Sequence, residues 1–159
     1  MKLQGTVSYA LVLAVISWAS PAGAQESKTT APNADKQYSG MYSFLKEGEF
    51  VQLTVEDDGR ITGFVSRYGD GESDKDAFLD QYFRSGKLEG NKLSFVTETV
   101  HAVWFEFKGA VERGEGKNPG DEAYYVLKGT LTYNATDAGK KAITHPREVE
   151  LKMFPKKAS

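Results

Sequence analysis

The stretch GEFVQLTVEDDGRITGFV, residues 48–65, predicts two β-strands joined by a tight turn. Apolar side chains recur at every second position in Val51, Leu53 and Val55, which is the period of a strand with one buried face. The Asp-Gly pair at positions 58–59 supplies the positive φ that a short hairpin turn requires. Because the link is short, the two strands are expected to be antiparallel neighbours.

The same pattern extends through the rest of the chain. Short apolar and aromatic runs are broken by Gly, Asn or Asp at intervals of about ten residues, and helical periodicity is nearly absent. Gly90 and Asn91 offer a second tight turn. About eight strands are therefore expected. Their ranges are 38–45, 49–57, 60–68, 82–89, 92–100, 102–113, 123–134 and 147–154.

Glycines on the inward faces of the strands predict a strongly coiled sheet. Gly63, Gly109 and Gly129 each lie between two inward apolar residues of the same strand. Glycine weakens a flat strand, so its repetition on one face is typical of a curled one. Curled strands in an antiparallel meander predict an all-β fold, a single up-and-down β-barrel of about eight strands. A two-sheet β-sandwich is the alternative.

The start of the first strand resembles a family pattern. Gly40, Met41 and Tyr42 are similar to the Gly-x-aromatic opening of calycin barrels such as lipocalins and avidins, and residues 48–65 look like the second and third strands of an avidin-type barrel. The resemblance implies an eight-stranded barrel open at one end, in families that mostly bind small ligands. Avidins hold their ligand among several tryptophans, whereas Trp104 is the one tryptophan that follows residue 24. Biotin binding is therefore not expected.

The N-terminus predicts an exported protein. Lys2 precedes an apolar run at residues 9–19, and an A-x-A cleavage pattern ends at Ala24. The run is shorter than the ~20 apolar residues that span a membrane, so the mature protein is expected to be secreted or periplasmic and not membrane-spanning. The expected organisation is a signal peptide at 1–24, a disordered polar linker at 25–36 and a β-barrel domain at 37–157.

Composition narrows the classes of partner. The chain has 20 Lys and Arg, 22 Asp and Glu, and no Cys. Removal of Lys2 with the signal peptide changes the formal net charge from −2 to −3, which is 19 basic minus 22 acidic residues. Nucleic acid is not expected to bind such a surface. Without disulfides, an exported domain depends on its own core for stability.

A small apolar or amphipathic ligand inside the barrel is the first hypothesis for function. Ligand sites are concave and mostly apolar, with a few polar groups. A barrel of about eight strands either holds one small ligand or is filled by its own side chains, and both cases stay open. Arg67 would bind an anionic ligand group or pair with Asp70 or Asp80. The expected ligand-binding residues are Tyr42, Arg67, His101, Phe105, Phe107 and Tyr125.

The second hypothesis is a protein–protein interaction module, such as an exported inhibitor or envelope factor with a filled barrel. Alternation places Val103 and Phe105 inside and Trp104 outside, where it would form a partner surface or pack on the outer wall. The third hypothesis is an isomerase or cyclase in which an inward His101, near Glu98, acts as general base. A hydrogen-bonded structural histidine is its alternative. No catalytic residue, metal site or cofactor is assigned.

The loop at residues 70–76 is rich in carboxylates at alternate positions, as oxygen ligands for Ca²⁺ would be. Lys75 stands where an EF-hand loop needs Gly, and Gln81 where it needs Glu, so no calcium site is expected. Ser73 or Asp74 is instead expected to cap a short helical turn that plugs one barrel end. That turn would place Phe78, Leu79, Tyr82 and Phe83 on one side.

Two further polar residues lie near the C-terminus. His145 precedes Pro146 in a polar stretch and is expected in a loop. Asn134 begins an Asn-x-Thr sequon, which is a glycosylation acceptor in hosts that modify exported proteins in this way. Neither His101 nor His145 lies in a metal-ligand spacing such as H-E-x-x-H.

Overall fold

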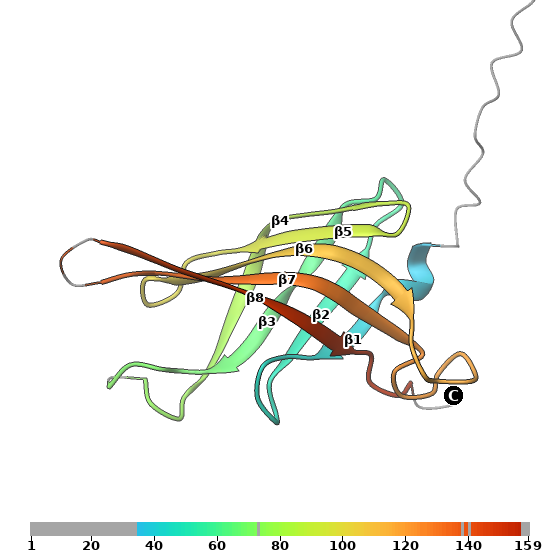
Figure 1. Ribbon diagram of the computed structural model, residues 1–159, viewed down its shortest axis with the longest axis horizontal. Coiled ribbons are helices and arrows are strands. Elements are labelled where there is room, and N and C mark those ends of the chain that lie inside the picture. The colour runs from blue at the N-terminus through green and yellow to red at the C-terminus, as the bar shows by residue number, and fades with distance from the viewer. Residues whose placement is uncertain (1–34, 73, 138, 140, 157–159) are drawn as a thin grey trace, which may run out of the picture.

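The chain folds into one antiparallel sheet whose eight strands follow each other in sequence order (Figure 1). The computed structural model describes residues 35–156 apart from 73, 138 and 140. The predicted all-β antiparallel meander is confirmed. Its elements are η1 (Asp35–Tyr38), β1 (Gly40–Ser43), β2 (Phe50–Val55), β3 (Ile61–Tyr68), β4 (Phe78–Glu89), β5 (Lys92–Thr97), β6 (Val103–Arg113), β7 (Tyr125–Thr136) and β8 (Ala142–Lys152).

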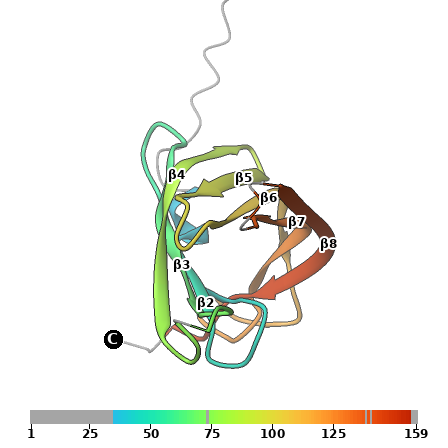
Figure 2. The same ribbon diagram turned by 90° about the vertical axis from the view of Figure 1, so that its left-hand side faces the viewer.

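The sheet curls strongly into a half-barrel, as Figure 2 shows, and its two ends in the strand order are joined at one point. An antiparallel bridge joins Tyr42 of β1 to Met153, directly after β8. Beside it, the backbone N–H of Phe154 donates to the carbonyl oxygen of Met41 at 2.8 Å. The strands therefore form one continuous curled sheet and not the two packed sheets of the β-sandwich alternative.

Close backbone contact at glycine allows this curl. Gly109 of β6 and Gly129 of β7 stand directly opposite each other. A Cβ atom at Gly109 would lie 2.7 Å from the Phe107 ring and would overlap the carbonyl oxygen of Lys128. Gly63 has a φ of 146°, and a Cβ atom there would overlap the backbone of β2. The inward glycines thus occupy positions where no side chain fits.

The interior is filled by the protein's own side chains. Phe95, Phe105 and Phe107 are each at most 1% exposed. Phe83, Phe95 and Phe107 form a stack with ring centroids 4.4 Å and 5.4 Å apart. Aliphatic residues fill the space around these rings. They include Val51, Leu53, Val55, Ile61, Val65, Leu93, Val111, Leu127, Leu131 and Leu151.

The short helix η1 packs at one end of the barrel. The Tyr38 ring lies edge-on to Tyr125 with centroids 4.9 Å apart, and the Tyr42 hydroxyl donates to the Tyr38 carbonyl oxygen at 2.7 Å. Because η1 begins at Asp35, it includes the last two residues of the expected linker, 25–36. The expected signal peptide lies outside the described residues.

Two strands begin earlier than the sequence indicates. β4 begins at Phe78, so the expected helical turn is wrong. Pairing with β3, in which Tyr82 lies opposite Phe64, supplies the backbone hydrogen bonds that a helix would have supplied. β8 begins at Ala142, so His145 is a strand residue and not a loop residue.

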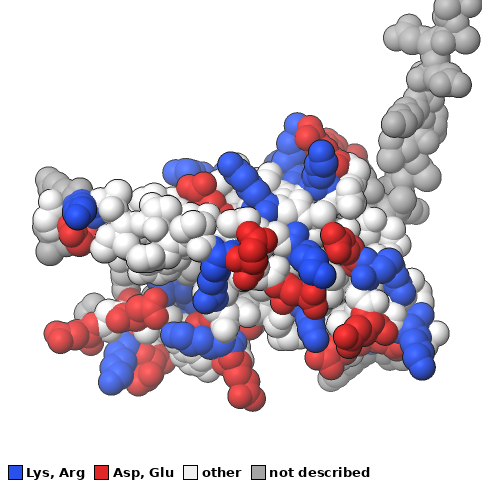
Figure 3. All heavy atoms as spheres, viewed as in Figure 1, with Lys and Arg blue, Asp and Glu red and all other residues white. Residues whose placement is uncertain are grey.

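The outer surface carries charges of both signs. Lys and Arg side chains lie among Asp and Glu side chains over the face that Figure 3 shows. This face therefore has no extended region of a single charge.

In the part of the chain that the structure describes, no helix is long and apolar enough to cross a membrane.

Replacing Gly109 tests the close backbone contact. Gly109→Val is expected to destabilise the domain by about 3 kcal/mol, because the branched side chain would push β6 and β7 apart. Urea unfolding measures this change. Lys108→Ala, at the exposed neighbouring position, is the control and should change stability by less than about 0.5 kcal/mol. Equal stability of the Gly109→Val protein and the wild type would show that the contact is not tight.

Candidate functional site

Alternate loops of the meander gather at one end of the barrel, here called the mouth (left in Figure 1). Contacts between these loops confirm that they lie together. Lys46 Nζ lies 3.4 Å from Asp70 Oδ1, and His101 Nδ1 lies 2.5 Å from Asp74 Oδ2. The mouth consists of the loops at 44–49, 69–77 and 98–102 together with the β7–β8 hairpin.

A cavity opens at the mouth because β1 and β8 differ in length. β1 ends at Ser43, whereas β8 begins at Ala142 and pairs with β7 along its whole length. The bridge to β1 lies at Met153, so it does not reach the first half of β8. The cavity has a volume of about 240 Å³ and is lined by Leu45, Leu131, Tyr133, His145, Pro146 and Arg147.

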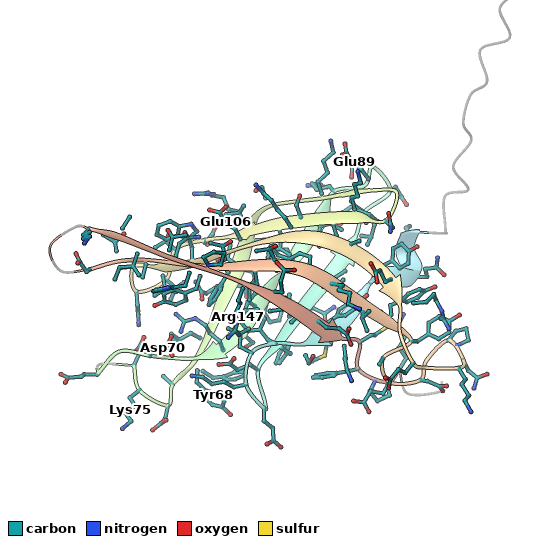
Figure 4. All side chains as sticks on the ribbon, in the orientation of Figure 1. Tyr68, Asp70, Lys75, Glu89, Glu106 and Arg147 are labelled. Carbon is teal, nitrogen blue, oxygen red and sulfur yellow. The ribbon has the colours of Figure 1, made fainter. Side chains whose placement is uncertain are left out.

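This cavity combines an apolar floor with a basic rim. Leu131 is 1% exposed, and the half-buried Tyr133 ring lies 5.7 Å from the Phe105 ring. The His145 ring centroid is 6.3 Å from that of Tyr133. Arg147, labelled on β8 in Figure 4, is exposed, and no carboxylate pairs with it among the described residues. An anionic group in the cavity would find this free guanidinium.

Arg67 lies deeper, inside the barrel. It is 3% exposed, and its guanidinium lies 5.6 Å from the centre of the Phe105 ring. Nη1 donates to the carbonyl oxygen of Tyr68 at 2.9 Å and to Asp70 Oδ2 at 3.2 Å. The pairing with Asp70 that the sequence offered as one alternative is therefore present. The Arg67 guanidinium therefore has hydrogen-bond partners within the protein, and its bond to Asp70 holds the β3–β4 loop against the barrel.

Gln81 is a buried polar residue that the sequence analysis did not assign to the barrel interior. It is 0% exposed, and its Oε1 accepts a hydrogen bond from Arg67 Nε at 2.6 Å. Its Nε2 donates to the carbonyl oxygens of Glu98 at 3.2 Å and Val103 at 2.9 Å. Gln81 thereby joins β3 to the β5–β6 turn. The sequence could have indicated this position only if β4 had been expected to begin at Phe78, because alternation from Phe78 then turns Gln81 inward.

His101 does not point into the barrel, so its expected inward position is wrong. It lies in the β5–β6 turn with a φ of 51°, and its side chain is 55% exposed. The positive φ values of His101 and Ala102 interrupt the alternation on which the expectation depended. Its partner is Asp74 and not Glu98. His101 therefore cannot act as a base inside the barrel, as the isomerase or cyclase hypothesis requires.

The carboxyl group of Asp74 is held in its charged form. The hydrogen bond from His101 lowers its pKa most, and the backbone N–H of Gly71 and the charge of Arg67 act in the same direction. Burial of the carboxyl group opposes these effects. The contact thus fastens the β3–β4 loop to the β5–β6 turn at the mouth.

The other expected ligand-binding residues do not come together in one pocket. Tyr42 and Tyr125 lie near η1, away from the mouth, where burial raises the pKa of both hydroxyls. Phe105 and Phe107 are core residues of β6. Of the expected set, Arg67 and Phe105 are in contact with each other beneath the mouth.

Trp104 and Asn134 lie opposite each other on the outer wall. Trp104 is half-buried, and its Nε1 lies 3.3 Å from Glu106 Oε1, to which it donates. Asn134 is 6% exposed, and its Oδ1 accepts a hydrogen bond from the Thr144 hydroxyl at 3.0 Å. The side chain of Asn134, the asparagine of the sequon, is therefore buried and hydrogen-bonded in the folded chain.

A second hollow, of about 430 Å³, lies on the outer wall of β4–β6 and includes Phe107 in its lining. Two of its basic side chains already have acidic partners. Lys87 Nζ lies 2.5 Å from Glu89 Oε1, and Arg60 Nε lies 3.9 Å from Asp58 Oδ2. Glu89 is labelled in Figure 4 at the end opposite the mouth.

In the described residues, no group of three or more His, Asp or Glu side chains is placed to hold a metal ion.

Comparison with known proteins establishes the fold. No protein-family model matches the chain, and no curated protein matches its sequence. The crystal structure of rhizavidin superposes with a TM-score of 0.57 at 8% sequence identity, covering 76% of this chain and 84% of rhizavidin. At this identity the likeness is one of fold. The resemblance to avidin-type calycin barrels, inferred from residues 40–42 and 48–65, is confirmed at that level.

The Asp74–His101 contact predicts a pH dependence of stability. Because the folded-state pKa of Asp74 lies below its unfolded value, the contact stabilises the fold above the ordinary Asp pKa and is lost as the pH falls through the lowered value. The melting temperature of the wild type should exceed that of Asp74→Asn at about pH 7 and converge with it in acid. Asp76→Asn, in the same loop, is the control. A constant difference at every pH would contradict this account.

Proposed function

We propose that the protein is an exported binding protein that takes a small amphipathic ligand, with an apolar body and an anionic group, into the cavity at the mouth. The proposal depends mainly on one observation: Tyr133 and Arg147 line the same cavity of about 240 Å³, and no carboxylate pairs with Arg147 among the described residues. Export is proposed from the signal-peptide pattern at residues 1–24.

The filled interior supports a site at the mouth. A ligand in the middle of the barrel would have to displace Phe105 or Phe107, which are closely packed and at most 1% exposed. Drug-sized ligands occupy cavities of about 300–1,000 Å³, so the ligand proposed here is smaller or extends into solvent. The fold likeness to rhizavidin is consistent with small-ligand binding.

The chemistry of the lining supports an anionic ligand group. Arg presents a planar fork of N–H donors that matches a carboxylate or sulfonate. Leu131 and Leu45 offer an apolar surface, and Tyr133 offers a ring for stacking. His145 adds a ring N–H donor to the lining of the cavity.

Two fluorescent probes with the same ring system test this site. 1-Anilinonaphthalene-8-sulfonate carries an anionic group, and N-phenyl-1-naphthylamine lacks it. Arg147→Ala is expected to weaken binding of the sulfonate at least about fivefold, since a charge-assisted hydrogen bond is lost, and binding of the neutral probe by less than about twofold. Tyr133→Ala should weaken both. Fluorescence titration measures the affinities.

Two matched variants serve as controls for this titration. Arg84→Ala removes an exposed arginine of β4, and Tyr82→Ala removes an exposed ring of the outer wall. Both should bind the sulfonate as the wild type does. Loss of sulfonate binding in these variants, or unchanged binding in Arg147→Ala, would place the probe elsewhere and overturn the assignment.

The export proposal has its own test. Cleavage after Ala24 predicts that the chain in the exported fraction of its host begins at Gln25. Intact-mass spectrometry of the purified protein measures this. The denatured mass should equal residues 25–159, and an additional mass in the native spectrum would report a retained ligand. A chain that still begins at Met1 would contradict cleavage.

The interaction-module hypothesis is the second candidate function. A specific observation favours it, but on a surface other than Trp104. Large aromatic side chains are exposed together on the outer wall of β2–β4, with Phe78 at 47% and Tyr82 at 57%. Contiguous exposed apolar patches commonly mark binding surfaces.

A further inference from the structure

Five aromatic residues form a continuous surface on the outer wall, here called the aromatic face. Ring centroids are 5.9 Å apart for Phe50–Phe64, 6.1 Å for Phe50–Phe78, 5.6 Å for Phe64–Tyr82 and 5.1 Å for Tyr68–Phe78. The rings come from β2, β3 and β4, and alternation turns them away from the core. In Figure 4, Tyr68 is labelled near the mouth end of β3.

A carboxylate lies within this face. The strand register places Ser66 opposite Asp80, between the pair Tyr68–Phe78 and the pair Phe64–Tyr82. Successive residues on one face of a strand are about 7 Å apart, so Asp80 is flanked along β4 by two aromatic rings. Asp80 itself is exposed.

The rings cover the serine but leave the acid accessible. Ser66 is 1% exposed although it faces outward, because the rings of Phe50 and Phe78 meet across β3 above it. The Ser66 hydroxyl donates to Asp80 Oδ1. No basic group pairs with Asp80 among the described residues. Asp80 is exposed and no described residue donates to its Oδ2 atom, so this oxygen is open to an incoming donor.

Glu106 provides a contrast on the same barrel. It too lies beside an outward aromatic side chain, Trp104, and it is labelled in Figure 4. Its Oε1, however, accepts hydrogen bonds from Trp104 Nε1 at 3.3 Å and from Asn134 Nδ2 at 3.5 Å. Glu106 therefore accepts two side-chain hydrogen bonds, whereas Asp80 accepts one from Ser66 and has aromatic residues on either side of it along β4.

We propose that the aromatic face is a docking surface for an arginine side chain presented by a segment of another protein. A guanidinium is planar, stacks on aromatic rings and donates paired hydrogen bonds to a carboxylate. Between Phe78 and Tyr82 it would meet both kinds of partner, with the rings on either side and Asp80 at the base. Charge complementarity thus selects a cationic occupant, and the flanking rings favour arginine over lysine.

Charge also disfavours a second copy of this chain on the same surface. A twofold axis through the aromatic face would bring the two Asp80 carboxylates toward each other. Like charges at a desolvated contact oppose association. A partner with a basic side chain removes that conflict.

A nuclear magnetic resonance titration tests the proposal. The ¹⁵N-labelled chain is titrated with acetyl-Gly-Arg-Gly-amide and, separately, with the matched citrulline and lysine peptides. The arginine peptide is expected to shift backbone amides of residues 64–68 and 78–82 with a dissociation constant on the order of 1–10 mM, typical of one anchoring side chain. The citrulline peptide, which is neutral, and the lysine peptide should bind at least about fivefold more weakly.

Variants assign the effect to the aromatic face. Asp80→Asn and, independently, Tyr82→Ala should each weaken the arginine peptide by at least about tenfold, with amide dispersion showing that each variant is folded. Glu106→Gln and Arg147→Ala should leave the affinity unchanged, so this surface and the ligand cavity are tested separately. Equal binding of the citrulline or lysine peptide, shifts outside the aromatic face, or shifts of the same amides on dilution of the protein alone would overturn the proposal.

Discussion

The close approach of two backbones at Gly109 and Gly129 is the constraint on which the rest of the structure depends. Because no Cβ atom separates β6 from β7 there, the sheet curls far enough for the end of β8 to reach Tyr42 of β1. A sheet with this curl encloses a volume that Phe95 and its aromatic neighbours fill. The filled interior leaves the mouth and the outer wall as the surfaces on which we propose binding.

A buried polar layer separates the dry core from water at the mouth. Arg67 and Gln81 bond to each other and to backbone carbonyl groups, so neither is left without partners. Hydrogen bonds from Nε and Nη1 of Arg67, one of them to the Asp70 carboxylate, offset part of the cost of burying its charge. The Arg67 guanidinium therefore already has partners, whereas Arg147 lines the cavity and has no carboxylate partner among the described residues.

The sequence predicts the barrel better than the site. Alternation and inward glycines such as Gly63 are local signals, and they identify the strands and the coiling. The sequence does not reveal the start of β4, because the spacing of Phe78 and Tyr82 also fits a helix. Only their pairing with β3 shows that they belong to a strand. His101 was misplaced because its positive φ leaves no mark in the sequence. The cavity near Arg147 depends on the relative lengths of β1 and β8, which is a long-range property.

The unequal lengths of β1 and β8 have a consequence for colloidal behaviour. An unpaired strand margin is a template on which other chains can add strands and aggregate. In the part of β8 that the bridge to β1 does not reach, Pro146 removes one backbone donor and Arg147 and Glu148 add charge. These residue types discourage such growth. The strand margin that opens the cavity thus carries residue types that oppose the addition of a strand from another chain.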